Sequence, residues 1–244
     1  MDLFNILIRK NFSTCKTLCK AVPNNLKGKK ADSKKWLIRY IRDPYVEKAR
    51  QENYRCRSAF KLLEINDRFN ILTPGLCVVD CGAAPGSWTQ VAVNLTNASG
   101  KTENTPVGSV YAIDRLPIHH IEGATTFGNL DFTTNLAQTK LRELLKQPVD
   151  VVMSDMAPNA TGIRDIDHDQ IIVLAYAAME FAIKMSKVDG TFVVKIWDGS
   201  KSPQFEKDVA RFYNHVKIVR PDATRDESTE KYVLARGFKG LKTS

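Results

Sequence analysis

The feature that most constrains this fold is an alternation of short apolar segments and helical segments that begins at residue 76. The short apolar segments are typical of buried strands, and the segments between them carry apolar residues at helical spacing. This alternation predicts a mostly parallel sheet covered by helices on both faces. The predicted strands are 76–81, 109–114, one within 124–132, 149–155, 190–197, 216–220 and 231–238, and the predicted helices are 87–97, 133–147, 167–187 and 202–214.

The last two predicted strands have a charged loop but no helix between them, so we expect them to pair antiparallel. Residues 31–73 read as helical and are divided into two helices by Pro44. Asp167 is a plausible N-cap for the long apolar helix that follows it. The 244 residues suffice for one domain, 31–244, with a helical extension at its N-terminal end and a separate segment, 1–30, before it.

Residues 1–30 carry seven lysines and arginines and one acid, separated by hydroxylated and apolar residues. This composition is typical of a mitochondrial transit peptide, which predicts a location in the mitochondrial matrix. The alternative is a flexible basic arm that contacts RNA directly. The apolar run 3–8 is too short to span a membrane. Five cysteines without a C-x-x-C pair indicate a reducing compartment, and neither they nor the four histidines have metal-ligand spacing.

The first strand ends in a glycine-rich turn, VVDCGAAPGSW, from Val78 to Trp88. Such a turn lies at the carboxyl edge of a doubly wound sheet, where ligands bind. Its glycines are not spaced as G-x-G-x-x-G, and Asp80 stands directly before it. A carboxylate is poorly suited to a phosphate and well suited to an ammonium or a hydroxyl group. S-adenosyl-L-methionine carries an amino group and ribose hydroxyls but no phosphate, so we expect this cofactor rather than a dinucleotide.

Two further predicted strands end in acids that suit the same cofactor. Asp114 is placed to accept hydrogen bonds from ribose hydroxyls, and Asp131 with Phe132 suits an adenine ring. Taken singly, each acid could be a turn cap, and Trp88 could be helix packing. The candidate cofactor-binding residues are Asp80, Gly82, Ala83, Pro85, Gly86, Ser87, Trp88, Asp114, Asp131, Phe132 and Asp155.

Several motifs together resemble a known family: RSAFKLLEI, VVDCGAAPGSW, SDMAPNATG, VVKIW and STEKYVLA. In this order they resemble the FtsJ/RrmJ RNA ribose 2′-O-methyltransferases over residues 36–240. The resemblance implies a Rossmann-like class I methyltransferase fold with a mostly parallel seven-stranded sheet. Within the family, the short chain and the basic N-terminus are most similar to the mitochondrial member that modifies a uridine in large-subunit ribosomal RNA.

The family's catalytic Lys-Asp-Lys-Glu pattern falls on Lys61, Asp155, Lys195 and Glu230. Methyl transfer requires that the ribose hydroxyl be oriented and activated. We expect Lys195 to steer or deprotonate that hydroxyl and Asp155 to orient Lys195. Lys61 would hold the target phosphate or lower the pKa of the other lysine, and Glu230 would fix the lysine geometry. Lys61 could instead be a solvated helix residue and Lys195 a strand-end charge.

The net charge of +9 favours a polyanionic partner, here ribosomal RNA or a precursor of the large ribosomal subunit. A basic cluster that could contact RNA phosphates, as a helical RNA-binding extension would, precedes the first strand: Arg39, Arg42, Lys48, Arg50, Arg55 and Arg57. The alternative is that these residues simply form the solvated faces of helices. Ser58 and Tyr232 are weaker candidates for substrate contact. Three other functions stay open: a non-catalytic ribosome-assembly factor, a messenger-cap 2′-O-methyltransferase and, least favoured, a dinucleotide oxidoreductase.

Overall fold

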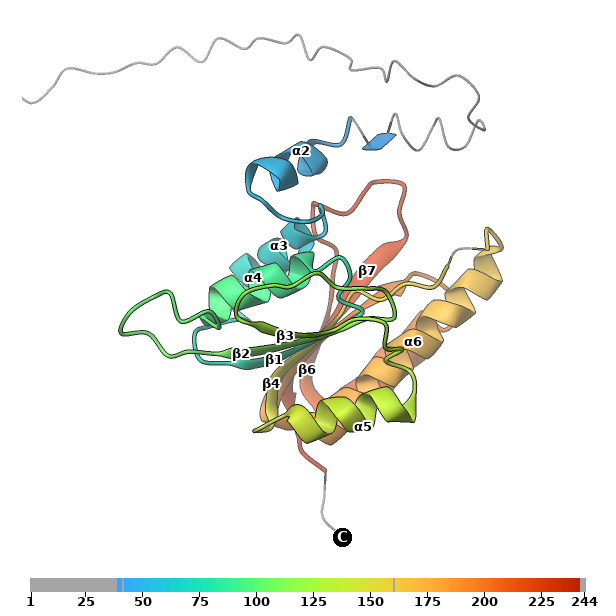
Figure 1. The fold of residues 1–244 in the computed structure, drawn as a ribbon. Helices are drawn as coiled ribbons and strands as arrows, with labels where there is room; N and C mark the ends of the chain where they lie inside the picture. The colour runs from blue at the N-terminus through green and yellow to red at the C-terminus, as the bar shows by residue number, and fades with distance from the viewer. Residues whose placement is uncertain (1–38, 41, 160, 242–244) are drawn as a thin grey trace, which may run out of the picture. The chain divides into compact units, whose positions relative to one another are not determined.

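The computed structural model describes residues 39–40, 42–159 and 161–241 (Figure 1). The chain divides into two units, Met1–Glu47 and Lys48–Ser244. In the first unit the described residues include the start of helix α2 (Pro44–Gln51), which begins at the proline predicted to break the helical run. The transit-peptide prediction for residues 1–30 lies outside the described residues. Everything that follows concerns the second unit.

One sheet of seven strands organises the second unit, in the order β3-β2-β1-β4-β5-β7-β6. Strands β1 to β5 are mutually parallel, and β7 pairs antiparallel with both β5 and β6. This arrangement confirms the predicted mostly parallel sheet and the antiparallel final pair. The strands are β1 (Cys77–Cys81), β2 (Ser109–Ile113), β3 (Ala124–Phe127), β4 (Val149–Ser154), β5 (Ser186–Trp197), β6 (Tyr213–Val219) and β7 (Glu230–Phe238).

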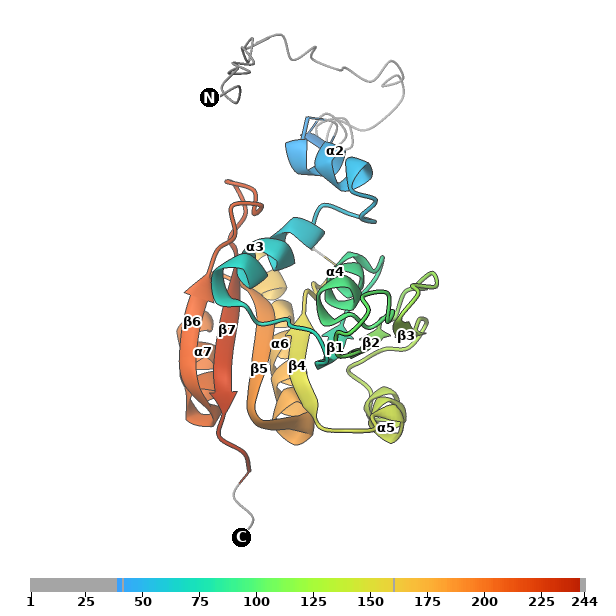
Figure 2. The same ribbon diagram turned by 90° about the vertical axis from the view of Figure 1, so that its left-hand side faces the viewer.

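Helices cover both faces of the sheet, as predicted (Figures 1 and 2). Helices α3 (Ala59–Phe69) and α4 (Ser87–Thr96) pack on one face, where Leu62 and Val91 join a core with Val78 and Val193. The opposite face is covered by α5 (Asn135–Leu144), α6 (Arg164–Met185) and α7 (Ser202–Phe212). Among the described helices, none is both long and apolar enough to cross a membrane.

Side chains alternate between the two faces along each strand, and this alternation positions the polar residues at the strand ends. Val78, Met153 and Val193 all pack in the core under α3 and α4. Residues two positions further along, Asp80, Asp155 and Lys195, therefore lie toward the same face. Tyr232 pairs with Lys195 across β5 and β7 and belongs to the same core.

Three local predictions were wrong. The second predicted helix is interrupted between Gln51 and Ala59, because Asn53 adopts a left-handed conformation (φ 59°). Helix α6 begins at Arg164, so Asp167 is not its N-cap; its carboxylate instead accepts from the backbone N–H groups of the preceding loop. Strand β3 ends at Phe127, so residues 129–132 follow it as a loop and do not end the strand.

Candidate active site

A cleft of about 950 Å³ opens at the carboxyl ends of β1, β2 and β4, beside the first half of α6. The chain runs from β1 outward through β2 and β3 and then returns to β4 on the other side of β1. The cleft thus lies at the point where the strand order reverses, which is where open α/β sheets bind ligands. Five of the predicted cofactor residues line it: Gly82, Asp114, Asp131, Phe132 and Asp155.

The glycine-rich turn has no room for side chains at two positions. Gly82 and Gly86 adopt φ values of +79° and +112°, which favour glycine. A Cβ at Gly82 would lie 2.2 Å from Cγ of Met156, and one at Gly86 would lie 2.6 Å from Cδ1 of Ile121. The turn therefore packs directly against the loop after β4 at Gly82 and against the segment between β2 and β3 at Gly86. Ala83, Pro85, Gly86 and Ser87 shape the turn and are not among the residues that line the cleft.

Asp80 is fully buried at the end of β1. Its Oδ2 accepts a hydrogen bond of 2.6 Å from Thr89 of α4, whereas its Oδ1 has no partner among the described residues. Burial raises the pKa of Asp80 to about 7, and the nearby Asp155 and Asp114 carboxylates contribute in the same direction against the Thr89 hydrogen bond. Asp80 does not line the cleft itself, and its unpaired oxygen is a candidate partner for a cationic group of a ligand.

Asp114 and Asp131 present carboxylates to the cleft, but they differ in their local contacts. Asp114 accepts the N–H of Ala84 at 2.9 Å and that of Leu116 at 2.7 Å, so it ties the loop after β2 to the glycine-rich turn. The side chain and backbone N–H of Thr133 donate to Asp131 and lower its pKa. Phe132 contributes a wall of the cleft, although most of its ring is buried.

Arg55 braces the same turn from outside the cleft. Its guanidinium donates to the carbonyl oxygens of Pro85 at 2.7 Å, His119 at 2.9 Å and His120 at 2.8 Å. Sequence reasoning had grouped Arg55 with candidate phosphate-binding residues. Its donors instead hold the glycine-rich turn against the loop after β2, a role that only the folded chain reveals.

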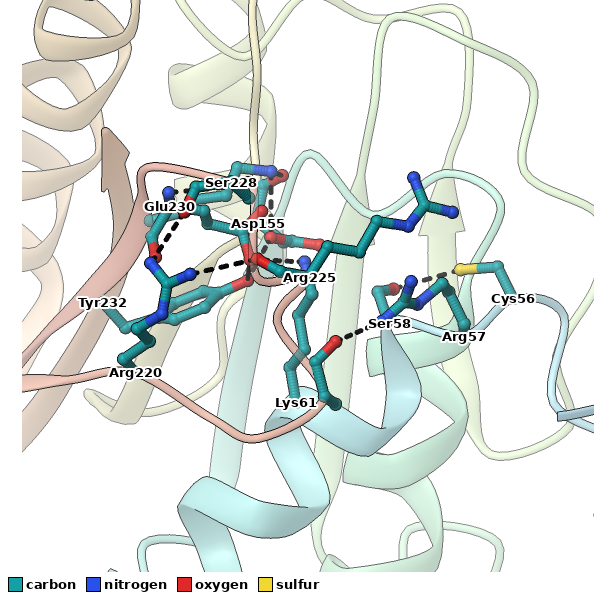
Figure 3. A network of polar contacts seen from close by, with 12 residues as sticks. Cys56, Arg57, Ser58, Lys61, Asp155, Arg220, Arg225, Ser228, Glu230 and Tyr232 are labelled. Carbon is teal, nitrogen blue, oxygen red and sulfur yellow. Dashed lines mark hydrogen bonds and ion pairs between the residues drawn. The ribbon is translucent and has the colours of Figure 1, made fainter. Parts of the chain in front are cut away.

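The four predicted catalytic side chains form two ion pairs in one cluster. Figure 3 shows three of them, Lys61, Asp155 and Glu230, with Tyr232 between the two carboxylates. Nζ of Lys195 lies 2.9 Å from Oδ1 of Asp155 and donates to the Asp155 carbonyl oxygen at 2.5 Å. Nζ of Lys61, from α3, lies 2.5 Å from Oε1 of Glu230 at the start of β7. The side chains are only 8% exposed for Lys195 and 17% for Asp155, and 13% and 11% for Lys61 and Glu230.

Tyr232 joins the two ion pairs. Its hydroxyl lies 2.8 Å from Oδ1 of Asp155 and 3.2 Å from Oε1 of Glu230, and burial together with these two carboxylates raises its pKa well above the ordinary value. Burial would raise the pKa of Asp155, but the charges of Lys195 and Lys61 outweigh it and lower that pKa. Asp155 is therefore a carboxylate at neutral pH, with cations on two sides.

Trp88 packs against this cluster from α4. Its ring centroid lies 5.5 Å from that of Tyr232, and its Nε1 donates to the Ser58 carbonyl oxygen at 2.8 Å. Trp88 is buried and does not line the cleft, which matches its reading as helix packing. The Ser58 hydroxyl lies 2.7 Å from that of Ser87, so the start of α3 is connected to the start of α4.

Arg220 holds the loop that leads to Glu230. Its guanidinium donates to the carbonyl oxygens of Arg225 at 3.0 Å, Asp226 at 3.3 Å, Ser228 at 2.7 Å and Glu230 at 3.3 Å (Figure 3). Sequence reasoning missed Arg220, since an arginine at the end of a predicted strand gives no sign of its partners. Nearby, Arg57 donates to the Ala223 carbonyl oxygen, so two arginines brace this loop.

The family model described as FtsJ-like methyltransferase matches residues 54–238. Over 226 residues the chain is 54% identical to "rRNA methyltransferase 2, mitochondrial" of Drosophila melanogaster, which covers 92% of this chain and 90% of that protein. It is 43% identical over 213 residues to "Ribosomal RNA large subunit methyltransferase E" of Roseobacter denitrificans, covering 87% of this chain and 88% of that one. A crystal structure of a ribosomal RNA methyltransferase from Plasmodium falciparum has the same fold, with a TM-score of 0.67 at 24% identity over 77% of this chain and 100% of that chain.

Proposed function

Because the chain belongs to the FtsJ-like methyltransferase family, we propose that it methylates a ribose 2′-oxygen, in a uridine of mitochondrial large-subunit ribosomal RNA, with S-adenosyl-L-methionine as methyl donor. The observation that carries this proposal is the cluster of Lys61, Asp155, Lys195 and Glu230, which brings four separate motifs together beside Asp155, a residue that lines the cleft. The name of the Drosophila relative supports ribosomal RNA as substrate and the mitochondrion, in our proposal its matrix, as location.

The residues around the cleft fit S-adenosyl-L-methionine. The cofactor carries an ammonium, a sulfonium and ribose hydroxyls, and it supplies an electrophilic methyl group. Gly82, Asp114, Asp131 and Phe132 line the cleft and would hold it, and the buried Asp80 would add negative charge beside it when ionised. A phosphate group would be repelled by these carboxylates, which argues against a dinucleotide.

Lys195 and Asp155 would act on the attacking hydroxyl. Two of the three N–H donors of Lys195 are directed at Asp155, which fixes Nζ beside the cleft and leaves one donor for a substrate oxygen. We place the ribose 2′-hydroxyl against this nitrogen, so that Lys195 orients the oxygen for in-line attack. For Lys195 to take the hydroxyl proton, its ammonium must first lose the third proton to solvent, so that two N–H groups stay on Asp155 and the lone pair faces the hydroxyl. The hydroxyl proton then passes to Nζ as the oxygen attacks the methyl group.

Lys61 and Glu230 would position the nucleotide and the first ion pair. The charge of Lys61 acts on Asp155, and Glu230 shares the Tyr232 hydroxyl with Asp155, so a change in one pair alters the other. The side chain of Lys61 is the more exposed of the two lysines, and Lys61 is the one that we assign to the phosphate of the target nucleotide.

Methyl transfer by the Lys195→Ala variant tests this proposal. The purified chain is incubated with methyl-labelled S-adenosyl-L-methionine and either large-subunit particles or their naked RNA, and the digested nucleosides are identified by mass spectrometry. We expect label in 2′-O-methyluridine with the native chain and with Lys140→Ala, an exposed lysine on α5, and at least a hundredfold less with Lys195→Ala.

The outcomes also separate the alternatives. Cofactor binding without label on either RNA substrate would indicate a non-catalytic assembly factor. Inhibition by capped RNA, with label at a cap-proximal ribose, would indicate a messenger-cap enzyme. Full activity of Lys195→Ala would refute the assigned role of this lysine.

A further inference from the structure

A second hollow lies on the α3 face of the sheet, beyond the C-terminal end of α3. This basic groove has a volume of about 540 Å³ and shares no lining residue with the cleft. Thr191 of β5 and Leu234 of β7 contribute to it, and Phe69 at the end of α3 lines it as well. His215, Lys217 and Arg236, all exposed, supply its charged and titratable side chains.

Strand pairing brings these three side chains together. His215 pairs with Arg236 and Lys217 pairs with Leu234 across β6 and β7, so residues of both strands point to the same face. Gly237 follows with φ +72°, and beyond it Phe238 packs in the core of the opposite face. Arg236 shares the groove face with Leu234 by strand alternation, and the chain turns to the other side of the sheet beyond Gly237.

The cations of the groove lack acidic partners in the described part of the chain. Most other lysines there form ion pairs, for example Lys101 with Glu122 and Lys231 with Asp198, but Lys217 and Arg236 form none. Asp189 is the one acid that lines the groove. Lys217 instead lies 5.7 Å from the centroid of the Phe69 ring, and the guanidinium of Arg68 lies 5.1 Å from the same centroid.

We propose that this basic groove binds the phosphate backbone of the ribosomal RNA at a second contact, away from the target nucleotide. The inference rests on the proposed function, since it takes the substrate to be RNA. Exposed cations without acidic partners, gathered around an aromatic ring, complement a polyanion. Phosphate contacts of this kind fix the orientation of a nucleic acid without reading its sequence.

The position of the groove gives this contact a purpose. Arg236 is four residues along β7 from Tyr232, and Thr191 is four residues along β5 from Lys195. At about 3.3 Å per residue, the groove lies roughly 13 Å from the catalytic cluster along the strands. A long RNA can occupy both places at once, whereas a short oligonucleotide that fills the active site cannot.

The double variant Lys217→Ala/Arg236→Ala tests the inference, with Lys140→Ala/Arg142→Ala on α5 as the control of equal charge change. Affinity for a large-subunit RNA fragment is measured at several salt concentrations, together with melting temperature and S-adenosyl-L-methionine affinity. We expect binding about tenfold weaker in the groove variant and a log–log salt slope lower by about 1.5, from the loss of two phosphate contacts. Melting temperature and cofactor affinity should match those of the control.

The kinetics distinguish this inference from the proposed function. With the long RNA we expect the groove variant to have a raised KM and an unchanged kcat, and with a short RNA around the target we expect native behaviour. Equal RNA affinity and equal salt slope in the two double variants would overturn the inference. That result would also be expected if the groove binds an acidic protein and not RNA. If the native chain methylates no RNA at all, the proposed function fails, but the binding comparison still decides whether the groove contacts RNA.

Discussion

Replacing Asp80 with asparagine should make the protein more stable and its proposed cofactor site weaker. Burial raises the pKa of Asp80 to about 7, so the folded protein favours the protonated acid. Asparagine has nearly the shape of that acid and can still accept the hydrogen bond from Thr89. It cannot ionise, and therefore it never places an unpaired charge beside the cleft.

The size of the effect follows from linkage. The ordinary pKa of an aspartate is 3.8, and that of Asp80 in the folded protein is about 7. At pH values between these two, the folded state holds a proton that the unfolded state has released, so the free energy of unfolding falls as the pH rises. At about 1.36 kcal/mol per pKa unit, the full cost approaches 4 kcal/mol above pH 7. Between pH 5 and pH 8 the advantage of Asp80→Asn should therefore widen by roughly 3 kcal/mol.

Urea denaturation at pH 5, 6, 7 and 8 measures this difference, with Asp67→Asn, an exposed aspartate on α3, as the control. Isothermal titration at pH 8 should show weaker S-adenosyl-L-methionine binding by Asp80→Asn, whereas at pH 5 the two proteins should bind alike. A stability difference that is the same at every pH would refute the reasoning. So would undiminished cofactor affinity of the variant at pH 8.

Three further changes test other parts of the site. Tyr232→Phe removes the hydroxyl between two carboxylates and should cost about 1.5–3 kcal/mol of stability by urea denaturation; retention of full stability and activity would exclude a linking role. Arg55→Gln should weaken cofactor binding and leave RNA affinity intact by filter binding, while the opposite result would restore a phosphate-binding role. Gly82→Ala places a Cβ against Met156 at positive φ, so we expect thermal unfolding to show a loss of at least about 1 kcal/mol in the free energy of unfolding, together with weaker cofactor binding. A substitution without effect on stability would show that the turn is not tightly packed.

The order of elements could be predicted from the sequence, because buried parallel strands and amphipathic helices leave different apolar spacings. The antiparallel final pair followed from the missing helix between β6 and β7. The ends of helices and strands were harder to predict, since they depend on the backbone conformation of single residues. Asn53 interrupts the helical run by adopting positive φ, and its neighbours continue a helical apolar pattern across it.

The residues of the candidate site could be predicted where they belong to a family motif. Lys61, Asp155, Lys195 and Glu230 lie together in the structure, but their division into two ion pairs depends on strand register. The supporting arginines could not be foreseen. Arg55 and Arg220 both donate to backbone carbonyl oxygens, and a carbonyl that accepts from a distant side chain leaves no signature in sequence.

The position of β7 between β5 and β6 has a consequence for synthesis on the ribosome. Translation delivers β6 before the strand that connects it to the sheet, so β6 has no place to pair until β7 has emerged. Glu230 and Tyr232 arrive on that same strand. A nascent chain that has not yet exposed β7 therefore lacks Glu230 and Tyr232 of the proposed catalytic cluster and leaves the edge of β5 open. The proposed active site and the complete sheet should therefore form together, at the last step of folding.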